Sequence, residues 1–382
     1  MGTINEIVNK GRRKLKYTLT DSIEKAFYSK KAKQNNTDTI ILRLDGIGDY
    51  ILFRNFIEDV YRARENSGKI VLCGNILWKD LAEKLDCRFI SEFIWVNVPL
   101  LHSNAYRFSI YRKLQATQCA ILLHPVYSRT DESDKLALHS GAREIVGYNG
   151  DTVNISAEKK EENNKRYSRL IEPSQKNMFE FYRNKYFFEA VLNKKLSVTK
   201  PAINLPVSNS ERGGYIIIFP GAGHQNRKWP VNNFAALCKN ISQTYKLPIL
   251  ICGSERDSEV AREIIANSDV PIQDSTGKFS LFETTEAMQK ASLVISSDSG
   301  PMHISVALNI PTICISNGNN YNRFCPYPDE MGVKLLVVLP GEFENMISNK
   351  ESRENLFGKE SELNMNLIPS EKVFQAVKKI LA

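Results

Sequence analysis

A short apolar run, a glycine-containing turn and a helical pattern follow one another in both halves of this 382-residue chain. In the first half, residues 39–44 (TIILRL) precede the turn at residues 45–49, and a helical pattern covers residues 50–65. Nearly continuous, β-branched apolar runs are typical of parallel strands that are covered on both faces. Strand-like runs at residues 69–73, 93–98 and 119–124 alternate with helical patterns, which predicts βαβ units.

The same order restarts after a stretch rich in proline and glycine at residues 200–214. Such a stretch is typical of a linker, so we predict two Rossmann-like α/β domains that face each other across a cleft. The predicted divisions are a leader at residues 1–36, domains at residues 37–200 and 201–369, and a C-terminal helix at residues 370–382. The mixed-charge run at residues 158–169 is expected to be an exposed loop. Ligands are expected at the carboxyl ends of the strands, where the cleft lies.

Composition narrows the class of protein. The sequence has no continuous apolar run long enough to span a bilayer and no apolar signal region near its start, so we expect a cytoplasmic protein. Its 7 cysteines are scattered without a CxxC pair, which predicts reduced thiols rather than a disulfide framework or a zinc site.

The net charge of +8 is unevenly placed, because residues 1–35 are strongly basic. The run at residues 12–16 (RRKLK), with apolar residues spaced along the same segment, suits an anionic membrane surface. A solvated leader explains the same pattern equally well. Nucleic acid is not expected as a partner, since no nucleic-acid-binding motif follows.

The turn after the first strand combines Gly46 and Gly48 with Asp49. The glycines permit a tight turn and close approach to a ligand. A carboxylate at the start of the next helix is able to accept a proton from a hydroxyl nucleophile, but aspartate also caps helices. Both interpretations stay open at this point.

The second domain repeats the arrangement at residues 220–230 (PGAGHQNRKWP). Gly221, Ala222 and Gly223 expose backbone N–H groups, and the cations Arg227 and Lys228 follow. This composition is typical of a phosphate-binding loop, and the two cations suit a departing diphosphate. A solvated loop is the alternative.

A third turn contains Glu255 and Asp257, either of which suits the ribose of a nucleotide; Asp257 equally suits a helix cap. A fourth begins with Asp298, Ser299 and Gly300, which precede a helix. Backbone N–H groups at a helix start favour an anion.

His303 lies one turn further along this helix, as a ligand-binding or a core histidine. No HExxH, DxD or clustered Cys/His motif is present, so we expect no metal. Without family knowledge, these turns indicate a phosphorylated ligand in a cleft between two domains.

The four turns together resemble glycosyltransferase family 9, which contains the ADP-heptose:lipopolysaccharide heptosyltransferases. The resemblance rests on LRLDGIGDYIL, FPGAGHQNRKWP, ICGSERD and SSDSGPMHISVALNIP, and residues 138–149 also look like a segment of that family. It covers roughly residues 38–330, and the fourth turn is its most specific part.

The resemblance implies a GT-B fold with an acceptor-binding first domain and a donor-binding second domain. It further implies inverting, metal-independent transfer of a sugar, heptose from ADP-heptose, to a lipopolysaccharide core or related lipid-linked glycan. Asp49 takes the position of the general base, and Arg227 stands where family members carry lysine. The donor diphosphate falls to Asp298, Ser299, Gly300 and His303, and the ribose falls to Asp257, with Glu255 as a competitor.

Two other functions remain open from the sequence. One is an epimerase or hydrolase that acts on a nucleotide sugar, and the other is a non-catalytic binding or assembly protein of the same fold. Acceptor choice is expected in the loops at residues 75–80, 99–112 and 125–135. Arg107, Arg112 and Arg129 in these loops either meet acceptor phosphates or lie on a solvated surface.

Overall fold

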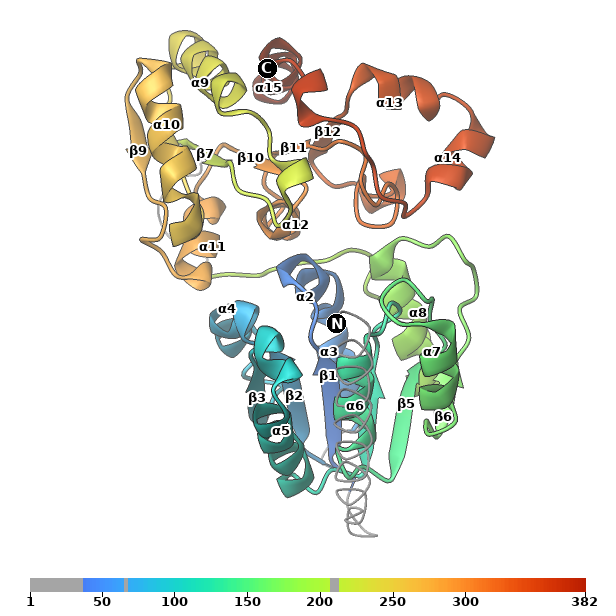
Figure 1. The fold of residues 1–382 in the computed structure, drawn as a ribbon. Helices are drawn as coiled ribbons and strands as arrows, with labels where there is room; N and C mark the ends of the chain where they lie inside the picture. The colour runs from blue at the N-terminus through green and yellow to red at the C-terminus, as the bar shows by residue number, and fades with distance from the viewer. Residues whose placement is uncertain (1–36, 65–67, 207–212) are drawn as a thin grey trace, which may run out of the picture.

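The computed structural model describes residues 37–64, 68–206 and 213–382, and the predicted basic leader lies outside them. Two parallel six-stranded sheets, each with helices against it, form two domains stacked on one another (Figure 1). None of the described helices combines the length and the apolar character that crossing a membrane requires.

The first sheet has the strand order β3-β2-β1-β4-β5-β6. Its strands are β1 (Thr39–Arg43), β2 (Ile70–Asn75), β3 (Glu92–Val96), β4 (Ile121–His124), β5 (Glu144–Tyr148) and β6 (Arg169–Ile171). The helices of this half are α2 (Ile47–Phe53), α3 (Asn55–Ala63), α4 (Lys79–Leu85), α5 (Asn104–Ala116), α6 (Asp131–Leu138), α7 (Ala157–Asn164) and α8 (Glu180–Leu192).

The second sheet has the order β12-β11-β10-β7-β8-β9. Its strands are β7 (Ile216–Phe219), β8 (Ile249–Ile251), β9 (Ile272–Asp274), β10 (Leu293–Ser297), β11 (Thr312–Ile315) and β12 (Leu335–Val338). The helices are α9 (Val231–Tyr245), α10 (Ser258–Ser268), α11 (Leu281–Gln289), α12 (Gly300–Ala307), α13 (Gly341–Met346), α14 (Lys350–Leu356) and α15 (Ser370–Leu381), with short 3₁₀ turns η4 (Gln225–Arg227) and η5 (Glu255–Asp257).

Both sheets have the same topology, in which the strand order reverses beside the first strand of the domain. That point lies between β1 and β4 in one sheet and between β7 and β10 in the other. Ligands of doubly wound sheets bind at the carboxyl ends of the strands on either side of such a reversal. The turns singled out in the sequence follow β1, β7, β8 and β10, so the predicted two-domain α/β fold is confirmed.

One local prediction was incomplete and one was wrong. The helical pattern at residues 50–65 is two helices, α2 and α3, which meet at Arg54. The mixed-charge run at residues 158–169 is mostly the helix α7, which Ser156 caps by accepting from the N–H of Lys159. The sequence gave no apolar periodicity for this helix, because its buried face is polar: the buried Asn163 donates to Asp134 over 3.0 Å.

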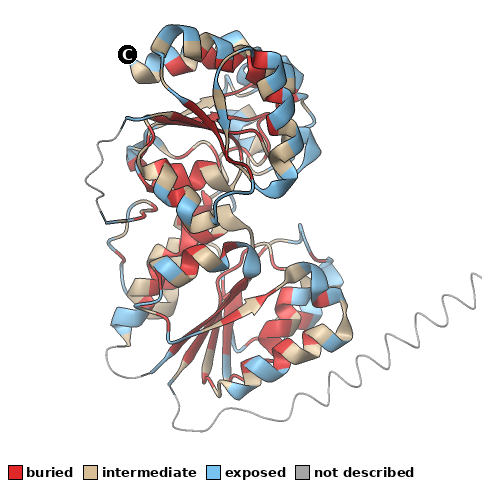
Figure 2. Ribbon diagram, turned by 90° about the vertical axis from the view of Figure 1, so that its left-hand side faces the viewer, coloured by how far each residue is buried: buried red, intermediate tan, exposed pale blue. Residues whose placement is uncertain are grey.

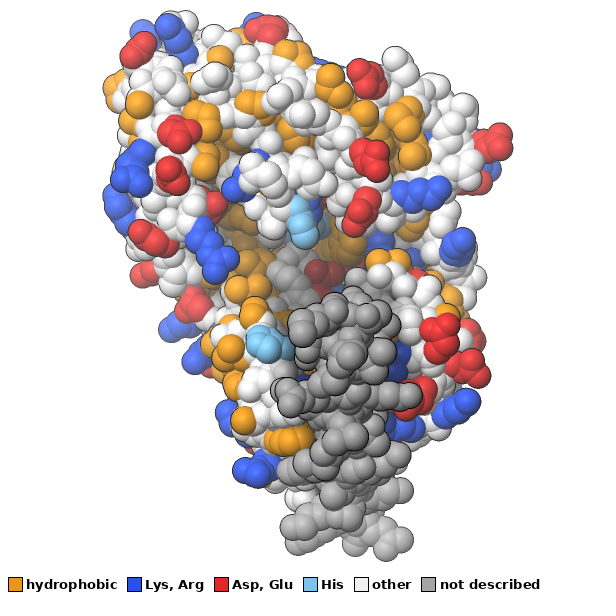
Figure 3. Space-filling view, viewed as in Figure 1, with side chains coloured by type: hydrophobic (Ala, Val, Ile, Leu, Met, Phe, Trp, Pro, Cys, Tyr) orange, Lys and Arg blue, Asp and Glu red, His pale blue; other side chains and the backbone are white. Residues whose placement is uncertain are grey.

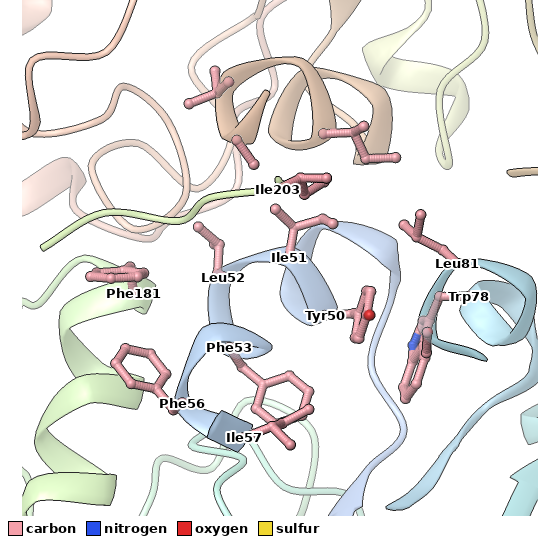
Figure 4. Packing of buried hydrophobic residues seen from close by; sticks show 14 of the residues in the cluster. Tyr50, Ile51, Leu52, Phe53, Phe56, Ile57, Trp78, Leu81, Phe181 and Ile203 are labelled. Atoms are coloured by element: carbon pink, nitrogen blue, oxygen red, sulfur yellow. The ribbon is translucent and has the colours of Figure 1, made fainter. Parts of the chain in front are cut away.

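A continuous apolar core joins the domains. Side chains of α2 and α3, among them Ile51 and Phe56, belong to the same buried cluster as Met302 and Ile304 of α12. Figure 4 shows how the α2 and α3 side chains pack with Trp78, Phe181 and Ile203 around them. Buried residues continue through the junction in Figure 2. Since apolar surface is shared across the junction, its burial holds the two domains together.

Candidate active site between the two domains

Glycines bring α2 and α12 into close contact at the centre of the junction. A Cβ on Gly48 would lie 2.5 Å from Cδ2 of His303, and one on Gly300 would lie 2.9 Å from Cβ of Ile47. By contrast, a Cβ on Gly46 would meet its nearest atom at an ordinary 3.6 Å. Close approach therefore requires glycine at positions 48 and 300. The contact also places the Asp49 turn against the Asp298–His303 segment. The space-filling view shows a hollow between the two domains (Figure 3).

Asp49 lies in the first turn of α2, but it does not cap the helix. The cap position belongs to Gly46, and no side chain caps this end. The interpretation of Asp49 as a helix cap is therefore wrong. Its side chain keeps 25% of its surface exposed, which leaves the carboxylate open to a ligand.

The carboxylate of Asp49 belongs to a charge cluster around Arg43, which is fully buried at the end of β1. Nη2 of Arg43 lies 3.0 Å from Asp45, 3.6 Å from Asp49 and 3.8 Å from Glu180, and Nη1 donates to Asn184 over 2.6 Å. One guanidinium is thus shared by three carboxylates.

This crowding changes proton affinity. Burial, together with the charges of Asp45 and Glu180, raises the pKa of Asp49 to about 7, against the opposing effects of Arg43 and Arg323. Burial likewise raises the pKa of Asp45. A carboxylate whose pKa lies near neutrality is well matched to general base chemistry at physiological pH.

Arg43, Glu180 and Arg323 were missed by sequence reasoning. Arg43 looks like a strand residue, and Glu180 begins the helix α8 far along the chain. Arg323 lies in the loop between β11 and β12 of the second domain and contacts Glu180 over 3.2 Å. A charged residue inside an otherwise apolar strand was the available signal for Arg43, because a buried charge requires partners.

On the side of the second domain, the glycine turn after β7 lies against Asp257. A Cβ on Gly221 would lie 2.4 Å from Oδ1 of Asp257. The other oxygen, Oδ2, accepts from the N–H and the hydroxyl of Ser254, both over 2.8 Å. Asp257 is thus the partner of the N-cap residue Ser254 in a capping box at η5, and its side chain does not cap the helix α10. Glu255, the competitor for the ribose, is exposed on the same turn.

Arg227 connects this turn to the end of β10. Its Nη1 donates to the carbonyl oxygen of Asp298 over 3.2 Å, and Nη2 would lie 3.7 Å from a Cβ on Gly223. Lys228 is half-buried beside it. The structure thus brings together the cation, the glycine turn and the start of α12.

The two titratable residues of the fourth turn are buried. Burial raises the pKa of Asp298 to about 6, against the opposing charge of Arg227. Burial lowers the pKa of His303 to about 3, and its Nδ1 lies 2.8 Å from the hydroxyl of Tyr327. At neutral pH His303 is therefore an uncharged hydrogen-bonding group, and it supplies no positive charge to an anion.

Asp298, Cys314 and Cys325 offer one group of converging metal ligands in the described part of the chain. Their ligand atoms lie within 4.8 Å of one another, and all three residues are buried. A carboxylate with two thiols is a donor set that suits zinc. The sequence pattern gave no sign of this group, because the two cysteines are brought together only by the contact of β11 with the following loop.

A cavity of about 190 Å³ opens beside Asp45, at the carboxyl ends of β1, β3 and β4. It is lined by Leu44, Asp45, Val98, Pro99, Leu101, His102, Val126, Thr130, Glu132 and Ser133, most of which fall within the ranges 99–112 and 125–135. The prediction that these ranges are loops was largely wrong, because the first is mostly the 3₁₀ turn η3 (Val98–His102) and the helix α5, and α6 begins within the second. Arg107 and Arg129, placed in these loops by the sequence, are buried. Arg107 donates to the carbonyl of Leu101 over 2.8 Å, and Arg129 lies 3.4 Å from Asp134. Neither is a solvated surface residue.

Residues 136–343 match the profile of Glycosyltransferase family 9 (heptosyltransferase), which is more than half of the chain. The chain belongs to glycosyltransferase family 9. The resemblance seen in the sequence is thereby confirmed.

Two curated relatives agree with this membership. A lipopolysaccharide core heptosyltransferase, OpsX of Haemophilus influenzae, is 26% identical over 149 residues, or 38% of this chain and 39% of the relative. Lipopolysaccharide heptosyltransferase 1 of Campylobacter coli is 32% identical over 130 residues, or 33% of this chain and 34% of the relative. The matched segments thus span less than half of each relative.

Solved structures match this chain over nearly its whole length. The glycosyltransferase family 9 structure from Veillonella parvula has a TM-score of 0.68 at 16% identity, covering 92% of this chain and 99% of that one. The E. coli heptosyltransferase WaaC with ADP has a TM-score of 0.68 at 14% identity, covering 90% and 100%. At these identities the likeness shows the fold, which is the GT-B fold that the resemblance implied.

The raised pKa of Asp49 predicts a pH-dependent stability. Between about pH 4 and pH 7 the folded protein holds a proton that an unfolded chain has lost, so stability falls as the pH rises through this window. We expect Asp49→Asn to be more stable than wild type at pH 8, by about 1 kcal/mol or more, and the gain to shrink toward pH 4. Urea unfolding at several pH values measures this, with Glu286→Gln on the exposed face of α11 as the control. If the difference in the free energy of unfolding between Asp49→Asn and wild type does not vary with pH, the raised pKa of Asp49 is contradicted.

The contact between α2 and α12 predicts opposite tolerance at two neighbouring glycines. Gly48→Ala forces the ring of His303 to move, so we expect a loss of about 1–3 kcal/mol in stability. Gly46→Ala meets only an ordinary contact and should unfold like wild type. Thermal unfolding of the two variants tests this, and equal losses would mean that the junction is looser than described.

Proposed function

We propose that this chain is an inverting glycosyltransferase that transfers heptose from ADP-heptose to a lipopolysaccharide core or a related lipid-linked acceptor. The observation that carries the proposal is Asp49, a partly open carboxylate with a pKa of about 7 beside the donor-side turns. The names of the matched relatives, which are lipopolysaccharide heptosyltransferases, support the substrate class. The solved WaaC structures with ADP and with ADP-2-deoxy-2-fluoro heptose support the nucleotide.

In the proposed reaction the oxygen of an acceptor hydroxyl forms a bond to the anomeric carbon of the donor sugar. The bond from that carbon to the diphosphate breaks, and the diphosphate leaves with the electron pair. The hydroxyl proton passes to the carboxylate of Asp49. The pKa of about 7 favours this role, because half or more of the carboxylate is ionised at neutral pH and its proton affinity is still substantial.

Charge that develops on the diphosphate requires fixed donors. In this proposal they are the backbone N–H groups of Ser299 and Gly300 at the start of α12 and of the turn Gly221–Gly223, together with Arg227 and Lys228. Arg227 is held for this task by the carbonyl oxygen of Asp298. His303 contributes as a neutral hydrogen-bonding group, and Asp257 or Glu255 binds the ribose.

These protein donors support transfer without a metal ion, which the proposal includes. The acceptor sugar is proposed to lie in the cavity beside Asp45, next to the base. The protein is proposed to work in the cytoplasm, at the inner face of the membrane that carries its lipid-linked acceptor. Contact of residues 1–35 with that anionic surface is part of the proposal and lies outside the described residues.

Replacing Asp49 by Asn tests the base. Asn keeps the size of the side chain and loses the proton-accepting charge, so we expect turnover of ADP-heptose to fall about a hundredfold or more. Affinity for ADP should stay near that of wild type. The assay is release of ADP with and without a lipopolysaccharide core acceptor, run in EDTA, in which the wild type should stay active. If Asp49→Asn keeps most of its activity, the role of Asp49 as the base is contradicted. If EDTA abolishes the activity of the wild type and zinc or magnesium restores it, transfer without a metal ion is contradicted.

Variants of the donor site should separate binding from turnover. Asp298→Ala and His303→Ala should weaken ADP binding, whereas Arg227→Ala should lower turnover more than binding, because preorganised charge acts most on charge that develops. The double change at Arg227 and Lys228 should be worse than either alone. Stabilisation of each variant by ADP in thermal unfolding measures binding. Unchanged ADP affinity in the whole set would place the donor elsewhere.

A further inference from the structure

Arg323 belongs to the second domain, and its side chain binds residues of the first domain. Its Nε is 3.2 Å from Oε2 of Glu180, its Nη2 donates to the hydroxyl of Ser128 over 2.8 Å, and its Nη1 lies 3.6 Å from Asp151. Its backbone carbonyl also accepts from the N–H of Glu180 over 2.8 Å. Arg323 is thus bound to the first domain through both its backbone and its guanidinium.

The contacts of Arg323 lead to the proposed base through one shared carboxylate. Oε2 of Glu180 binds Arg323, and Oε1 of the same residue lies 3.8 Å from Nη2 of Arg43. That atom in turn lies 3.6 Å from the carboxylate of Asp49. Arg323 is only 12% exposed, so water screens this chain of charges weakly.

The charges that face Asp49 come from both domains. The first domain contributes the anions Asp45 and Glu180 and the cation Arg43. His303 of α12 adds no charge, because it is neutral at physiological pH. Arg183 also lies near Glu180, at 3.6 Å. Among the described residues around Asp49, Arg323 is the cation that the second domain adds, and its charge opposes the rise in the pKa of Asp49.

We propose that Arg323 is a positioning residue of the transfer reaction, which brings a cation of the second domain into the charge cluster around Asp49 through Glu180. Without the charge of Arg323, the cations beside Asp45, Asp49 and Glu180 are Arg43 and Arg183 of the first domain. The carboxylate of Asp49 then keeps its proton more strongly, because the charge of Arg323 opposes the rise in its pKa. Arg323 therefore lowers the proton affinity of the proposed base from the domain that carries the proposed donor site.

Two substitutions separate the charge of Arg323 from its packing. Arg323→Gln keeps a long hydrogen-bonding side chain and removes the charge, whereas Arg323→Lys keeps the charge. Asp80→Ala is the matched control, because Asp80 accepts from the N–H of Phe282 over 2.7 Å and so joins the same two domains away from the Asp49 cluster.

The direct measurement is the titration of the Asp49 carboxyl by ¹³C NMR of the full chain labelled at aspartate, with Asp49→Asn to assign the signal. We expect the midpoint to rise by about half a unit to one unit in Arg323→Gln, and to stay near the wild-type value in Arg323→Lys and Asp80→Ala. An unchanged midpoint in Arg323→Gln would overturn the proposal. So would an equal rise in Asp80→Ala, since any loosening of the junction would then suffice.

The kinetic measurement rests on the proposed function. The acidic limb of the pH profile of kcat for ADP-heptose should move to higher pH in Arg323→Gln by the same amount as the NMR midpoint. A limb that stays in place while the midpoint moves would overturn the role in transfer. If the wild type releases no ADP and the midpoint still moves, the proposed function fails and the coupling of Arg323 to Asp49 stands.

Discussion

Glycine at positions 48 and 300 allows α2 and α12 to pack in direct contact, and the geometry of the site depends on this contact. The ring of His303 occupies the space where a side chain at position 48 would stand, and Ile47 occupies that space at Gly300. Because each helix begins directly after the first or fourth strand of its sheet, this contact sets the two strand-order reversals opposite each other. The apolar cluster shared by the two domains then holds them in that relation.

The charge cluster built on this contact is costly for the fold and useful for chemistry. Burial raises the pKa of Asp49 to about 7, and the charges of Asp45 and Glu180, which the fully buried Arg43 balances only in part, act in the same direction. Burial that leaves charges imperfectly paired lowers stability, and functional sites commonly retain such groups. The raised pKa of Asp49 lowers the stability of the fold above pH 7, and it also makes Asp49 a suitable proton acceptor near pH 7.

The turns that carry the candidate site were predictable because each is a local pattern: an apolar strand, a glycine and a polar residue at a helix start. The partners of Asp49 were not predictable in this way. Glu180 and Arg323 are distant from Asp49 in the sequence, and each resembles an ordinary surface charge until the fold buries it. Arg107 and Arg129 show the reverse case, since both looked like residues of solvated loops, whereas Arg107 is buried on α5 and Arg129 is buried before α6. The helix α7 was missed because hydrophobic periodicity is weak in a helix whose buried side chain is polar.

By itself the sequence determined the two-domain α/β fold and the strand ends at which ligands are expected, since these follow from short-range periodicity and local turn chemistry. The family came from the resemblance of its motifs to those of known members. Only the tertiary structure decided the electrostatic state of those residues. It removed the capping role from Asp49, made His303 neutral, brought Asp298 next to two cysteines, and placed a cation of one domain among the carboxylates of the other. Proton affinity depends on burial and on charges a few ångströms away, and residues distant in the sequence supply both.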